Sequence, residues 1–193
     1  MARKQPELTA QTKQNLMDAY WMLYTADFPG RITVKMITDK AGYNRGTFYA
    51  YFLDIEDLHS QIEDELLPLE ENFQKLREAT FAKNGRQIVE LLMQHDEVSG
   101  EKLRFLLGPR GSLSFQSKLK ETLNGLIKKY MSLDLDEPEN MIDYKSNILC
   151  AILLETIRYW YDRGNSLFPR EKMISHMLEV IFFGLKTGEM KGE

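Results

Sequence analysis

The segment TVKMITDKAGYNRGTFYAYF, which begins at Thr33, constrains the fold of this chain more than any other. Two short amphipathic stretches flank Gly42, and a glycine at such a point favours a sharp turn between two helices. Thr33 and Asn44 precede the two stretches, and both side chains are suited to cap the N-terminus of a helix. The segment therefore predicts a helix over 34–41, a tight turn, and a second helix over 45–51.

The second of these helices has two different faces. Phe48 and Phe52 lie four positions apart and so share the face that we expect to be buried against the preceding long helix. The exposed set that remains comprises Arg45, Gly46, Thr47, Tyr49 and Tyr51. An arginine can pair with guanine, hydroxyl groups can reach phosphates, and a glycine allows close approach to the bases. These residue types predict a DNA-reading helix, with Thr33 and Lys35 as further phosphate contacts.

Helical periodicity continues along the whole chain, and no segment has the pattern of a strand. A first helix is expected over 7–26, and Asp54 is expected to cap a fourth helix, which Pro68 kinks or divides. Further helices are expected over 86–96, 101–107, 112–132, 141–163 and 170–187. The breaks between them carry KNG, VSG, GPRG, DEPEN and GNSLFP. The sequence therefore predicts an all-α chain of about nine helices.

Charge is distributed unevenly along the chain. Residues 1–53 hold seven Lys/Arg and four Asp/Glu, net +3, whereas residues 54–193 hold eighteen Lys/Arg and twenty-five Asp/Glu, net −7. A basic head on an acidic protein suits an anionic partner at one end. The shift in composition places a domain boundary between residues 53 and 66.

The stretch ITVKMITDKAGYNRGTFYAYFLDIEDL resembles the DNA-binding segment of the TetR family of transcriptional regulators. The matching features are TV before the second helix, the AG turn, GTFY followed by Y and F in the third helix, and EDL at the start of the fourth. The resemblance implies a helix-turn-helix DNA-binding domain over 7–65 and a C-terminal ligand-binding and dimerisation domain over 66–193. It also implies a repressor that binds a palindromic operator as a homodimer and is released by a small-molecule effector. The candidate DNA contacts are Thr33, Lys35, Asn44, Arg45, Gly46, Thr47, Tyr49 and Tyr51.

One position departs from the pattern of this family. Ile55 stands where the family usually carries a lysine that lies against a phosphate. The resemblance therefore implies that this contact is lost. Side chains that could replace it are Arg3, Lys4, Lys13 and Arg31. Alternatively, Ile55 strengthens the packing of the fourth helix onto the first.

The last two predicted helices are apolar around most of their circumference, in NILCAILLETIRYWY and MISHMLEVIFFGL. Such helices need cover on both sides, and two from each of two subunits suit a four-helix interface with two-fold symmetry. Central helices of a monomer are the alternative. Side chains that could line an effector pocket, or simply form the core, are Met93, Phe105, Phe115, Met131 and Trp160.

Residue patterns of enzyme sites are sparse. His59, His95 and His176 are isolated, and none has a metal-binding spacing. The single cysteine, Cys150, excludes a thiolate zinc site and an internal disulfide. The sequence therefore predicts no enzyme, no cofactor and no metal. With no apolar leader and no apolar run of about 18 residues, it also predicts a cytoplasmic protein.

A helical protein–protein adaptor without DNA binding is the competing interpretation. Such a module would hold a peptide with the same aromatic helix. Salt separates the two interpretations, because binding to phosphates weakens steeply as salt rises and an interface of aromatic rings does not.

Overall fold

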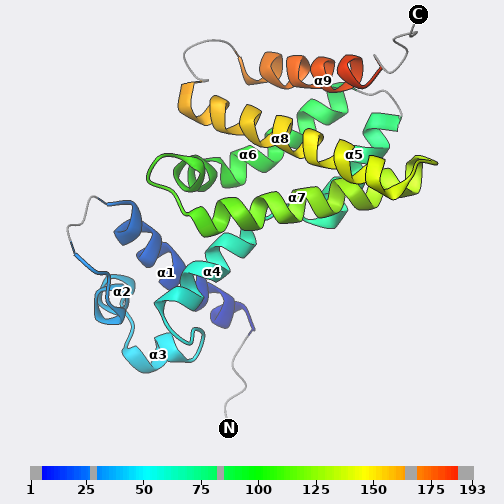
Figure 1. Cartoon of the computed structure of the whole chain (residues 1–193). Coiled ribbons are helices and arrows are strands. Elements are labelled where there is room, and N and C mark those ends of the chain that lie inside the picture. The colour runs from blue at the N-terminus through cyan, green and yellow to red at the C-terminus, as the bar shows by residue number, and fades with distance from the viewer. Residues whose placement is uncertain (1–5, 27–29, 82–84, 164–168, 187–193) are drawn as a thin grey trace, which may run out of the picture. The chain divides into compact units, whose positions relative to one another are not determined.

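The computed structural model describes residues 6–26, 30–81, 85–163 and 169–186, which form nine α-helices and no strand (Figure 1). The predicted all-α class is confirmed. The chain divides into two compact units, one ending at Glu65 and the other beginning at Leu66. The first unit contains α1 (Pro6–Thr25), α2 (Val34–Ala41), α3 (Arg45–Tyr49) and α4 (Ile55–Glu65). The second contains α5 (Glu70–Phe81), α6 (Gly85–Leu107), α7 (Leu113–Asp134), α8 (Glu139–Arg163) and α9 (Arg170–Lys186).

The first unit is a small cluster in which α1 contacts both α2 and α4, and α2 contacts α3. Its buried apolar side chains come from every one of these helices and from the turn after α3. They include Leu16, Met17, Tyr20, Ile37, Phe48, Phe52, Leu58 and Ile62. Full burial of one such side chain is worth roughly 1.5–3 kcal/mol relative to exposure. This core therefore fixes the short helix α3, which at five residues could not hold its shape alone.

The second unit is built around the pair α7 and α8, which pack against each other, while α6 and α9 both contact α8. An ion pair joins the two central helices, with Lys128 Nζ 3.1 Å from Asp143 Oδ1. Of the side chains considered for a pocket, Phe115 and Trp160 are buried, and Phe105 and Met131 are half-buried. The side chain of Met93 lies outside the described residues. None of the described helices has the length and apolar character that a membrane span requires.

One predicted break is wrong, because α6 continues through VSG as a single helix to Leu107. Ser99 and Gly100 are both buried there. Glycine costs a helix about 1 kcal/mol relative to alanine, but small residues allow neighbouring elements to pack closely. Tertiary packing has therefore overridden the local signal.

The predicted break at GPRG is confirmed, and geometry explains its second glycine. A Cβ added at Gly111 would lie 1.9 Å from the carbonyl oxygen of Leu106, so no other residue fits without movement of the backbone. Ser112 then caps α7, because its Oγ accepts a hydrogen bond from the Phe115 N–H at 3.1 Å.

Candidate nucleic-acid interface

The turn between α2 and α3 forms as the sequence predicts. Thr33 Oγ1 accepts a hydrogen bond from the Met36 N–H at 3.3 Å and so caps α2. Gly42 ends that helix with φ of 76°, a left-handed conformation that a residue with a Cβ adopts at a cost. Asn44 Oδ1 accepts from the Thr47 N–H at 2.9 Å and caps α3. These three residues fix the angle at which α3 leaves the turn.

The orientation of α3 is the central feature of this surface. Phe48 and Phe52 are 0% and 2% exposed, and their ring centroids lie 5.4 Å apart in the core. Tyr49 is 58% exposed, and Arg45 and Gly46 are exposed as well. The predicted burial of the two phenylalanines is therefore confirmed, and so is the outward position of Arg45, Gly46 and Tyr49.

Two candidate contacts are less exposed than the sequence predicts. Thr47 and Tyr51 are half-buried, and the Thr47 hydroxyl donates a hydrogen bond to Asn44 Oδ1 at 3.3 Å. The helix also ends at Tyr49, which places Tyr51 in the following turn, where its N–H donates to Phe48 O at 3.0 Å. The prediction missed this because the last turn of a short helix depends on packing that the local sequence does not reveal.

Of the candidate contacts near the start of α2, Thr33 and Lys35 are both exposed. Lys35 already has an anionic partner, since its Nζ lies 2.6 Å from Asp39 Oδ2. An exposed pair with this i, i+4 spacing contributes only about 0.3–0.5 kcal/mol. A phosphate could therefore displace Asp39 at small cost.

Sequence reasoning missed a residue that braces the turn. Asn15 of α1 donates a hydrogen bond from Nδ2 to the Tyr43 hydroxyl at 3.0 Å. This bond ties the long first helix to the turn between α2 and α3. No sequence signal pairs two residues that lie 28 positions apart, so only the fold shows it.

The segment that leads into α4 is held by a reciprocal cap. Asp54 Oδ1 accepts from the Asp57 N–H, and Asp57 Oδ2 accepts from the Leu53 N–H, both at 2.7 Å. Hydrogen bonds from Gln61 and from the Leu53 N–H, together with the nearby charge of Lys13, lower the pKa of Asp57. The cap fixes the backbone of Leu53, whose side chain is 83% exposed in the segment between α3 and α4.

A buried polar network links α1 to α4. The Tyr20 hydroxyl lies 2.9 Å from His59 Nδ1, and His59 Nε2 lies 3.1 Å from Glu63 Oε1. Glu63 is only 1% exposed. Burial raises the pKa of Tyr20 far above its ordinary value, with smaller contributions from Tyr24 and Glu63. A neutral imidazole with its proton on Nε2 would satisfy both neighbours, because the phenol donates to Nδ1 and Nε2–H donates to the carboxylate.

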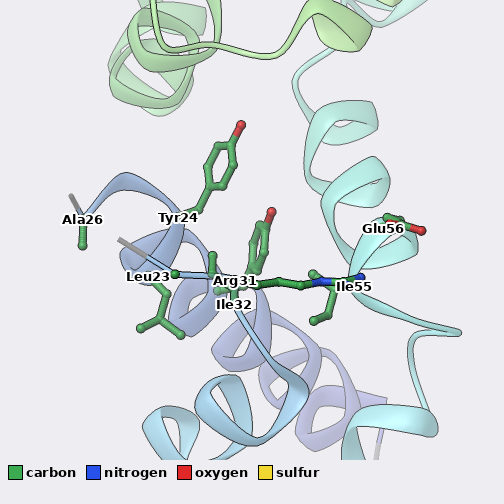
Figure 2. Close-up of a pocket in the computed structure, with 9 residues that line it drawn as sticks. Leu23, Tyr24, Ala26, Arg31, Ile32, Ile55 and Glu56 are labelled. Atoms are coloured by element: carbon green, nitrogen blue, oxygen red, sulfur yellow. The ribbon is translucent and has the colours of Figure 1, made fainter. Parts of the chain in front are cut away.

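A hollow of about 350 Å³ opens between the C-terminal end of α1, the segment before α2 and the start of α4. Its lining residues are Tyr20, Leu23, Tyr24, Ala26, Gly30, Arg31, Ile32, Ile55 and Glu56. Figure 2 shows the Arg31 side chain crossing this hollow toward Ile55. Ile55 is half-buried and lines this hollow together with apolar side chains of α1.

The compact unit that carries α3 is acidic, because it extends through α4. Up to Glu65 the chain holds seven Lys/Arg and ten Asp/Glu, net −3, whereas the segment up to residue 53 is net +3. The basic head that the sequence predicts is therefore only part of a structural unit. Attraction to an anionic partner must come from individual cations in favourable places.

No protein-family model and no curated protein matches the chain. Among solved structures, a TetR transcriptional regulator from Streptococcus agalactiae 2603V is 21% identical, with a TM-score of 0.62 over 91% of this chain and 96% of that one. The dihydroxyacetone kinase operon activator DhaS is also 21% identical, with a TM-score of 0.49 over 91% of this chain and 97% of that one. The first of these likenesses covers both compact units and agrees with the family resemblance of the helix-turn-helix segment. This chain therefore folds like a TetR transcriptional regulator.

Proposed function

We propose that the chain is a transcriptional repressor that binds double-stranded DNA through α3. The observation that carries this proposal is the orientation of α3, with Phe48 and Phe52 in the core and Arg45 and Tyr49 outside. A major groove about 12 Å wide admits one helix, and an arginine near its N-terminus can pair with guanine O6 and N7. The ammonium group of Lys35 and the hydroxyl groups of the neighbouring threonines and tyrosines suit contacts with the flanking phosphates.

Each candidate contact has a role in this proposal. Arg45 and Gly46 face the bases, and Thr33, Lys35, Thr47, Tyr49 and Tyr51 hold phosphates. Asn44 uses Oδ1 for the cap of α3, which leaves its Nδ2 to donate to the duplex. Because Thr47 and Tyr51 are half-buried, we expect them to contribute less than Tyr49.

We propose further that the protein acts as a homodimer. Along α8, four large apolar side chains are exposed at positions that share one face of the helix, namely Met141, Tyr144, Ile148 and Tyr159. A second copy would cover this α8 stripe through a two-fold contact. Two copies of α3 would then read half-sites about one helical turn, ~34–36 Å, apart.

Release by a small-molecule effector completes the proposal. The effector would bind among α6, α7 and α8 and would act only if it favours one arrangement of the dimer over another. Asn124 Oδ1 in α7 is buried without a hydrogen-bond partner in the described part of the chain, and a polar ligand would satisfy it. A screen in which no ligand alters DNA affinity would contradict this part alone.

The decisive experiment is selection of bound sequences from a pool of random duplex DNA. The proposal expects an enriched, roughly palindromic sequence with half-sites one helical turn apart. If no duplex is enriched, the adaptor is favoured. In that case the protein should bind a peptide with an affinity that does not change with salt. Exposed Tyr49 and Leu53 are the observation that supports that second candidate.

A further inference from the structure

Arg31 is an exposed cation to which the interface described above gives no role. Its side chain extends across the hollow toward Ile55, the first residue of α4 (Figure 2), and Glu56 lines the same hollow. Within the part of the chain that the structure describes, Arg31 forms neither a hydrogen bond nor an ion pair. Its charge is therefore available to a partner from outside the molecule.

The other described cations of this unit have neighbours or tasks. Lys35 is paired with Asp39, and half-buried Lys13 lies close enough to Asp57 to lower the pKa of that carboxyl. Lys40 lies in the last turn of α2, where the helix dipole favours positive charge. Arg45 is the candidate base contact, and Arg3 and Lys4 lie outside the described residues. Of the two candidates for a replacement phosphate contact that the structure describes, Lys13 and Arg31, geometry thus favours Arg31.

The direction of Arg31 also suits this role. Arg31 and Thr33 are exposed while Ile32 between them is half-buried, as expected for an extended segment whose alternate side chains point the same way. Thr33 itself has the extended φ of −119° and ψ of 154°. Arg31 therefore faces the side on which Thr33 is proposed to meet a phosphate.

The start of α4 needs such a cation if DNA is to approach it. Asp54 and Glu56 are exposed there, and neither has an ion-pair partner within the described residues. Asp57 adds a third carboxylate, whose lowered pKa keeps it ionised. Backbone phosphates would be repelled at this edge unless a positive charge offsets the carboxylates.

We propose that Arg31 is a positioning residue that binds a backbone phosphate at the edge where α4 begins and so sets the register of α3 on the duplex. This inference rests on the DNA-binding function proposed above. A guanidinium can hold a phosphate with two parallel hydrogen bonds, which fixes orientation as well as adding charge. A phosphate contact carries no base preference, so Arg31 contributes equally to every sequence.

The test compares Arg31→Ala with the wild-type full-length chain in binding to a random-sequence duplex, from roughly 50 to 200 mM salt. Loss of one phosphate contact should make the log–log salt slope shallower by about 0.9 and weaken binding roughly tenfold at ~100 mM salt. Arg31→Lys keeps the charge and should keep the slope. Arg86→Ala, an exposed arginine of α6, removes the same charge elsewhere and should leave the slope unchanged.

The outcomes separate this inference from the function on which it rests. A wild-type protein that binds no duplex would contradict both, whereas salt-dependent wild-type binding with an unchanged slope in Arg31→Ala would overturn only the role of Arg31. Thermal melting of each variant checks the fold. Arg31→Gln retains most of the side-chain stem over the hollow and should make the salt slope shallower by the same amount as Arg31→Ala. It can replace the alanine variant in the test if that variant unfolds.

Discussion

At the scale of single residues, Asn44 both caps α3 and belongs to the surface proposed to bind DNA. Asn44 caps α3 through Oδ1 and also lies exposed beside Arg45 at the start of that helix. A cap stabilises a helix by about 0.5–2 kcal/mol. In a helix of only five residues, this is a large part of the total stability of the helix. The short-range signals that position Arg45 are therefore also the ones that hold its helix together.

Replacing Arg45 with alanine should separate base reading from general DNA affinity. The proposed bidentate pair with guanine is worth about 1–3 kcal/mol, so operator affinity should fall by roughly 5- to 150-fold while random DNA is affected less. Competition binding with selected and random duplexes measures the difference. Equal binding of both duplexes by variant and wild type would remove Arg45 from the interface.

The reciprocal cap at α4 predicts a dependence of stability on pH. The pKa of Asp57 is lowered in the folded state, so its ionised form stabilises the fold above the unfolded pKa of about 3.9, and this contribution is lost as pH falls through the lowered value. Asp57→Asn should thus be less stable than wild type at pH 7, and the difference should shrink as pH falls through the lowered pKa of Asp57. Urea unfolding at several pH values would show the two curves converging, and parallel curves would contradict the assignment.

At the scale of elements, the joint between α1 and α4 is polar where most of the first unit is apolar. His59 bridges Tyr20 and the buried Glu63. A buried carboxylate is destabilised when it loses a hydrogen-bond donor. The network therefore holds α4 in one place against α1 more specifically than apolar contact alone would.

Replacing His59 with alanine should lower the free energy of unfolding by about 1–3 kcal/mol, because Glu63 would lose a hydrogen-bond donor. His176→Ala is the matched control, since that histidine is exposed beside Glu179 and its loss should cost less than about 0.5 kcal/mol. Adding Glu63→Gln to His59→Ala should recover part of the stability, because a neutral amide is less costly to bury. Denaturant unfolding of the four proteins, wild type included, completes the comparison.

The same joint marks the limit of what the sequence predicts. The turn at Gly42, the caps at Thr33 and Asn44, and the burial of Phe48 and Phe52 follow from signals within a few residues, and all are confirmed. His59 looked isolated because one of its partners, Tyr20, lies 39 positions away. The break predicted at VSG failed for a related reason, since the burial of Gly100 depends on distant helices.

At the scale of the whole molecule, the proposed function depends on an association through the α8 stripe. Ile148→Glu would place a charge in the centre of that stripe, and we expect a monomer that binds single half-sites weakly. Met22→Glu is the control, because that methionine is also exposed but belongs to α1 in the first compact unit and not to the stripe. Light scattering gives the mass of each variant, and a dimeric Ile148→Glu protein would refute this interface.

The net charge of −3 on the unit that carries α3 has a consequence for the cell, if DNA is its partner. Proteins held to DNA mainly by positive charge spend most of their time on unrelated sequence. An acidic head gains little from such contacts, so each molecule would leave wrong stretches of chromosome quickly. Few copies would then suffice to keep one control site occupied.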